Sequence, residues 1–319
     1  MSTPPSISVL PRPGSQLPST AFKWAAALAA ATIVVLIVLV GWELYVGSRQ
    51  SISMFGVPFL WSSKWDPVAE KYGAFPFIFG TFISSLLALA IAVPLGVATA
   101  LFLTELAPLK LRQPIIIAIE MLAAVPSVIF GMWGIFVLIP WLRDHLFVWL
   151  KHSLGFLPLF QGPVYGVSML AAGIIIAIMI LPIITSISRE ILRSVPDLQR
   201  EAAYALGATR WEVLRIAVLS YARRGLFGAS ILGLGRALGE TMAVTMVIGN
   251  RPQISASLFA PGYTLASVIA NEFTEATTDL YRSSLFELGL VLLAVTILVN
   301  IAAQVMLKSL AGSGSSKVA

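Results

Sequence analysis

Two ionisable residues, Arg236 and Glu240, stand four positions apart in an apolar stretch, residues 225–249, that carries no other charge. A charged side chain at the centre of a bilayer costs about 2.5–3.5 kcal/mol on insertion scales, so it is retained where it pairs or lines a polar path. Residues at positions i and i+4 share one face of a helix. The spacing therefore predicts that both side chains face one polar path through a membrane.

The chemistry of this pair suits an oxyanion that keeps a proton. A guanidinium presents a fork of donors that matches tetrahedral oxyanions. Glu240 would repel an aprotic dianion but can accept a hydrogen bond from a ligand hydroxyl group. The alternative is a structural salt bridge that locks Arg236 to Glu240. The nearby spacing Gly235-xxx-Gly239 favours close helix packing, and room for a ligand is the other interpretation.

Three further polar residues could extend the path. Thr241 and Asn250 continue a polar stripe from Glu240, although a threonine hydroxyl often bonds its own helix backbone instead. Glu120, in another apolar segment near Pro126, is a second acid expected to be buried. It could pair with Arg236 or line the path, and the sequence leaves both open.

The composition places these residues in a membrane. The chain is 58% hydrophobic and 11% charged with a mean hydropathy of +0.90, whereas soluble domains are about 25% charged. The basic residues lie in loops rather than in one patch, so nucleic-acid binding is not expected. Six segments reach the roughly 20 residues that a spanning helix needs. They are Trp24–Val46, Phe77–Glu105, Ile115–Pro140, Val164–Ser188, Leu226–Gly249 and Leu285–Leu307.

The distribution of Lys and Arg in the connections predicts that both termini are cytoplasmic. The expected organisation is a disordered tail (1–23), a first spanning helix (24–46), an outer loop (47–76), a core of five spanning helices (77–307) and a flexible tail (308–319). Pro94, Pro126 and Pro182 fall inside spans and are expected to kink them. Neighbouring helices must then cover the freed carbonyls, as in a bundle around a pathway.

The longest inner connection, residues 189–225, has the signals of a helix, a sharp turn and a second helix. Pro196 suits a helix start, and the run Asp197–Leu206 contains good helix formers. Gly207 is placed for a left-handed cap. Thr209 and Glu212 have the spacing of a capping box that begins the next helix. A solvated loop held by surface ion pairs is the alternative.

The segment EAAYALGATRWEVLRIAVLS, Glu201–Ser220, resembles the cytoplasmic signature of ABC-importer permeases. The residues that match it are Glu201, Ala202, Ala203 and Gly207, while Ser220 stands where proline is usual. In that family the segment is a coupling helix that docks on a separate ATPase subunit. The resemblance therefore implies that these four residues contact an ATPase.

Two other strings narrow the resemblance. GLGRALGETMAVTMVIGN, Gly233–Asn250, and MLAAVPSVIFGMWG, Met121–Gly134, resemble spans of the PstC-type permease family of phosphate ABC transporters. The resemblance implies an all-α membrane protein with six transmembrane helices in the type I ABC importer permease fold, located in the bacterial cytoplasmic membrane. Implied partners are a PstA-like second permease subunit in a heterodimer, two ATP-binding cassette ATPase subunits, an extracytoplasmic phosphate-binding protein and inorganic phosphate. Arg236 and Glu240 would contact phosphate in passage.

Two other kinds of transporter remain open. One is an ABC importer for sulfate, molybdate or tungstate. The other is a secondary transporter that works alone, with Arg236 and Glu240 as a proton relay. We expect no enzymatic activity in this chain, because no nucleotide-binding or catalytic arrangement is apparent. Neither a cofactor nor a metal is expected, although His145 and His152 lie seven residues apart beside Asp144.

Overall fold

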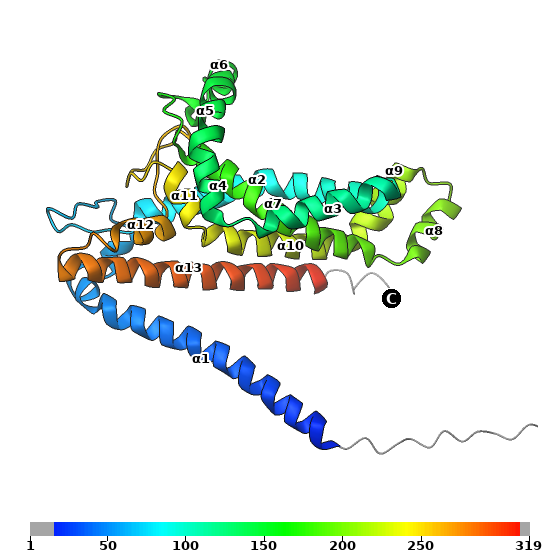
Figure 1. Ribbon diagram of the computed structural model, residues 1–319, viewed down its shortest axis with the longest axis horizontal. Coiled ribbons are helices and arrows are strands. Elements are labelled where there is room, and N and C mark those ends of the chain that lie inside the picture. The colour runs from blue at the N-terminus through cyan, green and yellow to red at the C-terminus, as the bar shows by residue number, and fades with distance from the viewer. Residues whose placement is uncertain (1–15, 313–319) are drawn as a thin grey trace, which may run out of the picture.

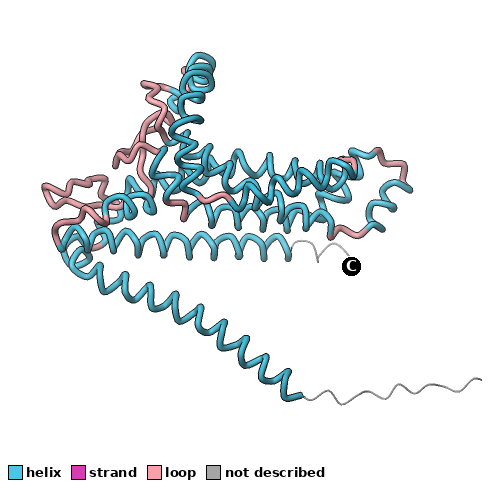
Figure 2. The backbone as a smooth tube through the Cα atoms, in the orientation of Figure 1, coloured by secondary structure: helices cyan, strands magenta, loops and turns pink. Residues whose placement is uncertain are grey.

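The computed structural model describes the backbone of residues 16–312 and the side chains of residues 20–308. Within that range the chain is helical and has no β-strand, apart from one isolated bridge between Asp66 and Lys71. The longer helices run side by side, and loops gather at both ends of the bundle (Figures 1 and 2). The helices are α1 (Gln16–Phe55), α2 (Phe75–Leu101), α3 (Leu109–Ala124), α4 (Ser127–Trp133), α5 (Ile139–Trp141), α6 (Val148–Leu154), α7 (Met169–Arg193), α8 (Asp197–Ala205), α9 (Arg210–Val213), α10 (Ser220–Leu238), α11 (Met242–Val247), α12 (Leu265–Glu272) and α13 (Asp279–Gly312).

Short irregular helices join several of these elements. Widened π-type turns at Phe102–Leu106, Gly134–Leu138, Leu142–Phe147 and Leu214–Leu219 extend α2, connect α4, α5 and α6 into one run, and connect α9 to α10. Single 3₁₀ turns occupy Val57–Leu60 and Pro158–Phe160. The run from α4 to α6 leaves the bundle and rises steeply from it in Figure 1.

Five helical runs in the described part of the chain are long and apolar enough to cross a membrane, one fewer than predicted. They are Thr20–Phe55, Phe75–Leu106, Ser127–Leu154, Met169–Arg193 and Asp279–Lys308. The first begins before the predicted Trp24, because α1 already starts at Gln16 and so includes residues 16–23 of the expected tail. Residues 1–15 and 313–319 of the two expected tails lie outside the described residues.

The predicted fifth and third spans are each broken. Leu226–Gly249 is divided into α10 and α11 at residues 239–241, and Ile115–Pro140 is divided into α3 and α4 at residues 125–126. The second break has a local cause: a residue before proline is forced towards extended backbone, and Val125 has φ −68° and ψ 128°. The proline inside α2 and the one inside α7 leave their helices unbroken.

Helix α7 is the centre of the bundle and packs against α2 and α10. A Cβ added at Gly96 of α2 would lie 2.9 Å from Ile184 of α7, and one at Gly233 of α10 would also lie 2.9 Å from that side chain. Because lipid supplies no hydrophobic drive between helices, such close packing of small residues holds them together. Among the described residues no atom lies within 4 Å of a Cβ built at Gly235, so the Gly235-xxx-Gly239 spacing forms no packing seam within this part of the chain.

Helix α1 lies along α13 near the α12 end of the bundle, and its first half diverges from the rest (Figure 1). The contact contains hydroxyl groups: the Ser51 N–H donates to Ser283 Oγ at 3.1 Å, and the Ser51 and Ser284 hydroxyls are 3.2 Å apart. Glu287 of α13, a buried acid that the sequence analysis did not single out, is 6% exposed. Polar contacts of this kind join helices within a membrane.

The first half of helix α12 is buried in the bundle. Thr264 caps it and forms a capping box with Ser267, while Leu265 and Val268 are fully buried. Glu272 at its end accepts hydrogen bonds from Trp65 Nε1 at 2.8 Å and from the Tyr281 hydroxyl at 2.6 Å. These bonds tie the loop before α2 to α12 and α13.

Candidate functional site

The two helix breaks line one cleft of about 480 Å³. The first break contributes Val125, Pro126 and Ser127, and the second contributes Gly235, Arg236, Gly239, Glu240, Thr241 and Met242. The breaks lie together because α11 packs against α4. The chain thus places interrupted backbone beside a cavity, which is where a membrane protein tolerates it.

Arg236 and Glu240 both line this cleft, but not as neighbours on one helix face. Arg236 is in the last turn of α10, which ends at Leu238, and Glu240 follows the helix with its N–H 3.4 Å from the Ala237 carbonyl oxygen. The predicted i, i+4 geometry is therefore wrong. Within the described residues no ion pair joins the two side chains, and the Arg236 side chain is exposed.

Ser127 is a cleft residue that the sequence analysis missed. It follows Pro126 and opens the helical run Ser127–Leu154. The N-terminal end of a helix carries unpaired N–H groups and a partial positive charge, and Pro126 at the cap position has no side-chain acceptor for them. A proline followed by serine inside an apolar segment was the sequence signal. This end adds positive potential to the cleft that contains Arg236.

The other predicted path residues separate into two groups. Thr241 lines the cleft, and its hydroxyl donates to the Gly239 carbonyl at 3.1 Å. Asn250 lies beyond α11, where its side-chain amide donates to the Thr245 carbonyl at 2.9 Å and its backbone has φ 49°. Glu120 does not line the cleft. Its side chain is 57% exposed and lies 3.7 Å from the Arg189 guanidinium, so the expectation that it is buried in this chain is wrong.

The helix–turn–helix predicted between α7 and α10 is present. Pro196 precedes α8, and Gly207 ends it with φ 82°. The Ala208 N–H donates to the Ala203 carbonyl at 3.2 Å and the Gly207 N–H to the Tyr204 carbonyl at 2.9 Å, as in a Schellman cap.

The second helix of this segment, α9, starts at the predicted capping box. The Thr209 side chain accepts from the Glu212 N–H, and Glu212 accepts from the Thr209 N–H at 2.7 Å. The backbone bond from Thr209 lowers the pKa of the Glu212 carboxyl below its usual value. The interaction is therefore present above the ordinary pKa of a glutamate and is lost as the pH falls through the lowered one.

The four signature residues of α8 and its turn face outwards: Glu201, Ala202 and Gly207 are exposed and Ala203 is half-buried. Large apolar side chains accompany them, with Leu206 89% exposed and Trp211 68% exposed. Large apolar side chains exposed on polar helices are typical of a contact with another protein.

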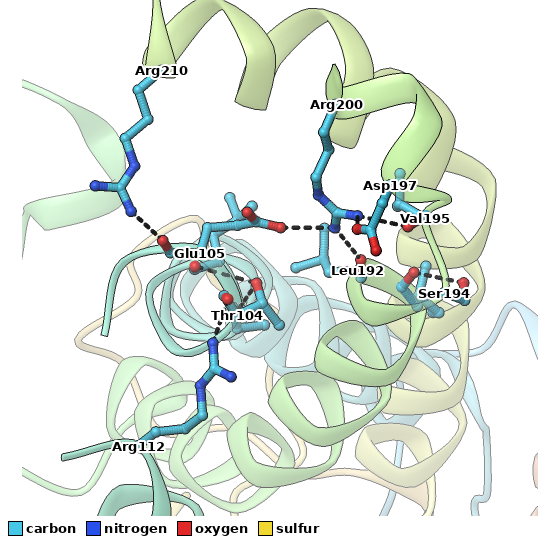
Figure 3. Close-up of polar contacts among 12 residues, drawn as sticks. Thr104, Glu105, Arg112, Leu192, Ser194, Val195, Asp197, Arg200 and Arg210 are labelled. Atoms are coloured by element: carbon cyan, nitrogen blue, oxygen red, sulfur yellow. Dashed lines mark hydrogen bonds and ion pairs between the residues drawn. The ribbon is translucent and has the colours of Figure 1, made fainter. Parts of the chain in front are cut away.

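A polar clamp fixes α8 to the end of α2 (Figure 3). The Arg200 guanidinium donates to Glu105 Oε1 at 2.9 Å, to Asp197 Oδ1 at 3.0 Å, and to the carbonyl oxygens of Leu192 and Val195 at 3.1 and 2.6 Å. The side chains of Arg200 and Glu105 are each 18% exposed.

Two further arginines bind carbonyl oxygens at the same end of α2. Arg210 donates to the Glu105 carbonyl, and Arg112 donates to the Thr104 carbonyl (Figure 3). Together with the Arg200 clamp, these contacts join α8, α9 and α3 to the end of a core helix. The sequence analysis placed Glu105 only at the boundary of a span and did not predict this pairing.

The histidine pair lies in the helical run from α4 to α6 rather than in a loop. His145 stacks on Trp141, with ring centroids 5.4 Å apart, and its Nδ1 is 3.0 Å from the Trp141 carbonyl oxygen. His152 is in α6.

An all-helical membrane chain with a polar cleft between broken helices and an exposed helix–turn–helix has the features of a transport permease. Residues 92–312 match the family of binding-protein-dependent transport system inner membrane components. Curated relatives carry the name phosphate transport system permease protein PstC. The one from Mesorhizobium japonicum is 52% identical over 87% of both chains, and the one from Haemophilus influenzae is 49% identical over 90% of this chain and 92% of the relative. The chain belongs to this permease family, on its PstC branch.

A solved structure of the MetNI methionine ABC transporter in an inward-facing conformation is similar in fold. It has a TM-score of 0.51 and 18% identity, with 79% of this chain and 98% of that chain covered. This likeness shows the type I ABC importer permease fold. The predicted fold class is therefore confirmed, except for the count of six helices.

Proposed function

We propose that this chain is the permease subunit of an ATP-driven importer that moves inorganic phosphate across the cytoplasmic membrane. The observation that carries the proposal is the Arg236 guanidinium, which lines a cleft beside Glu240 and Thr241 and forms no ion pair with a carboxylate in the described part of the chain. The PstC relatives are named for phosphate transport, which supports the choice of ligand.

The cleft suits phosphate better than sulfate because of Glu240. Near neutral pH phosphate retains at least one P–OH group, which can donate to a carboxylate, whereas sulfate has no proton and is repelled. Arg236 supplies the cationic fork, and the helix start at Ser127 adds partial positive charge. Glu240 orients the ligand or Arg236, while Thr241 contributes a hydroxyl. Glu120 and Asn250 have no part in this cleft, and we assign them no contact with the ligand there.

The proposed topology places both termini and the α8–α9 segment on the cytoplasmic side. Two ATPase subunits then bind the importer's coupling helices, and here the contact is made by Glu201, Ala202, Ala203 and Gly207. A PstA-like permease completes the pathway, and an extracytoplasmic phosphate-binding protein docks at the α12 end. The chain itself catalyses no reaction and needs no cofactor, because the partner ATPases hydrolyse ATP.

Alternating access follows from this arrangement. Closure of the ATPase dimer draws the coupling helices of the two permeases together, and α8 transmits that movement to the bundle through the Arg200–Glu105 clamp. The bundle then exposes its cleft to the outside and receives phosphate from the binding protein. Return to the resting state opens the cleft inwards.

The test is phosphate uptake by proteoliposomes that contain the complete transporter. We expect Arg236→Gln to reduce the uptake rate at least tenfold, since one charge-assisted contact contributes about 1.5–3 kcal/mol. The matched control is Arg223→Gln, which removes a guanidinium from the other end of α10, outside the cleft lining. Normal uptake by the Arg236 variant at normal membrane abundance would rule out the proposed role.

Two other functions give different results in the same vesicles. If the chain belongs to an importer for sulfate, molybdate or tungstate, those anions will compete with phosphate and inhibit phosphate uptake. A secondary transporter that uses Arg236 and Glu240 as a proton relay would move its substrate without ATPase subunits. The exposed signature residues of α8 and its turn favour a mechanism driven by a partner protein over a secondary transporter that works alone.

A further inference from the structure

A second polar hollow lies beyond α11, on the side of the bundle away from α8 and α9. It consists of two adjoining spaces of about 290 and 280 Å³, which share Tyr165, Arg251 and Pro261 in their walls. The larger space is also lined by Gln161, Gln253, Ser255 and Ser257. The hollow therefore contains one guanidinium together with amide and hydroxyl groups.

None of the described residues that line the hollow is acidic, whereas the cleft is lined by Glu240. Within the described residues the Arg251 side chain forms no ion pair. Arginine has five N–H donors and no acceptor. The Gln253 amide and the Ser257 hydroxyl already donate to the carbonyl oxygens of Pro261 and Gln161, so Arg251 carries the attraction for an anion. Such a lining favours an anion and makes no demand on the anion's protonation.

The loops around this hollow are held in place by backbone hydrogen bonds. The Leu258 N–H donates to the Leu159 carbonyl at 2.8 Å, and the Met169 N–H donates to the Ala260 carbonyl at 3.0 Å. Arg251 itself is fixed through its N–H, which donates to the Gly262 carbonyl at 3.1 Å. The guanidinium thus projects from a backbone that is tied to the core at both sides of the hollow.

Position along the chain links this hollow to the cleft. Glu240 and Thr241 precede α11, and Arg251 follows it. The six residues of α11 correspond to about 9 Å of helix. Two anion-attracting places therefore lie at the two ends of one short helix.

We propose that the hollow at Arg251 is an outer subsite for the phosphate anion, occupied before the anion reaches Arg236. This inference rests on the proposed function and deepens it. The outer subsite selects for negative charge only, and the inner cleft selects for a proton on the ligand through Glu240. An anion released at the outer face is thereby retained near the entrance until it enters the cleft.

The test uses the complete transporter in proteoliposomes with the phosphate-binding protein outside and inorganic phosphate as the probe. Three quantities are measured: phosphate moved per ATP hydrolysed, the ATPase rate, and the dissociation constant of the binding protein. We expect Arg251→Gln to lower phosphate moved per ATP about tenfold, because a charge-assisted hydrogen bond is lost. The dissociation constant of the binding protein should change by less than twofold. Arg251→Lys should give a phosphate-to-ATP ratio between that of Arg251→Gln and that of the unaltered transporter.

Arg282→Gln is the matched control. Arg282 lies in the first turn of α13 near the same end of the molecule, is half-exposed, and lies 4.0 Å from Asp279. It should leave the phosphate-to-ATP ratio within twofold of the unaltered transporter.

Three results would overturn the outer subsite. The first is an unchanged phosphate-to-ATP ratio in Arg251→Gln. The second is a lower phosphate-to-ATP ratio together with an equal rise in the dissociation constant of the binding protein, which would mean that Arg251 pairs with a carboxylate of that protein. The third is an equal loss in the Arg282 control. The proposed function fails separately, if the unaltered transporter moves no phosphate or if Arg236→Gln moves it normally.

Discussion

The Arg200–Glu105 clamp gives the sharpest test of how α8 is attached to the bundle. Arg200→Met keeps the length of the side chain and removes all of its donors. Removing one partner of a buried ion pair costs about 3–5 kcal/mol. Because both side chains are 18% exposed, the lower figure applies, and the 87% exposed Asp197 adds little. We therefore expect a loss of about 3 kcal/mol in the local stability of α8, after the discount for solvent exposure.

Hydrogen exchange of the assembled transporter measures this loss directly. A change of about 3 kcal/mol raises the open population of α8 about 100-fold, so its amide protection should fall by that factor while α7 keeps its protection. Glu105→Gln and the double variant complete a thermodynamic cycle. If the single variants act through their mutual contact, the double variant costs clearly less than their sum.

Two results would contradict this reasoning about the clamp. One is a fall in α8 protection of less than about threefold, or about 0.7 kcal/mol. The other is strict additivity in the cycle, which would mean that Arg200 acts only through the backbone carbonyls of Leu192 and Val195.

The other predictions concern the turn, the packing and the cleft. Gly207→Val should reduce ATPase stimulation about tenfold, because the left-handed backbone at φ 82° costs an L-residue about 1–2 kcal/mol and a β-branched residue more. Gly207→Asn should be tolerated. Equal ATPase stimulation in the two variants would contradict a dependence on this backbone conformation. Gly96→Ala should destabilise the purified chain by about 1–3 kcal/mol in thermal unfolding, since its Cβ would lie 2.9 Å from Ile184, whereas Gly228→Ala meets no atom within 4 Å and should not. Glu240→Gln should make sulfate a competitor of phosphate uptake about tenfold stronger, as repulsion of about 1–4 kcal/mol is removed; an unchanged inhibition constant would exclude electrostatic selection at Glu240.

Features set by neighbouring residues were predictable from the sequence. The turn at Gly207 and the capping box of Thr209 and Glu212 depend on residues within one helical turn. Hydropathy likewise predicted most of the spans, because burial in lipid depends on composition over about 20 residues.

Features set by distant contacts were not predictable in this way. Glu105 and Arg200 are 95 residues apart, and no local pattern announces their pairing. The break after α10 has no proline to mark it, so the sequence indicated one continuous helix through Arg236 and Glu240. Both residues nevertheless line one cavity, and their place on a substrate path stays a prediction.

The two interrupted helices divide the cleft lining between two groups of helices that share α7 as a neighbour. Helix α10, with Arg236, packs against α2, α7 and α13, while α11, which follows Glu240, packs against α4 and also against α7. A small rotation of one group on the other would change the width of the cavity without breaking any intrahelical hydrogen bond. The non-helical residues 239–241 and 125–126 are where the backbone can bend, and the Glu240 carboxylate stands at one of these bends while the Arg236 guanidinium belongs to the helix before it.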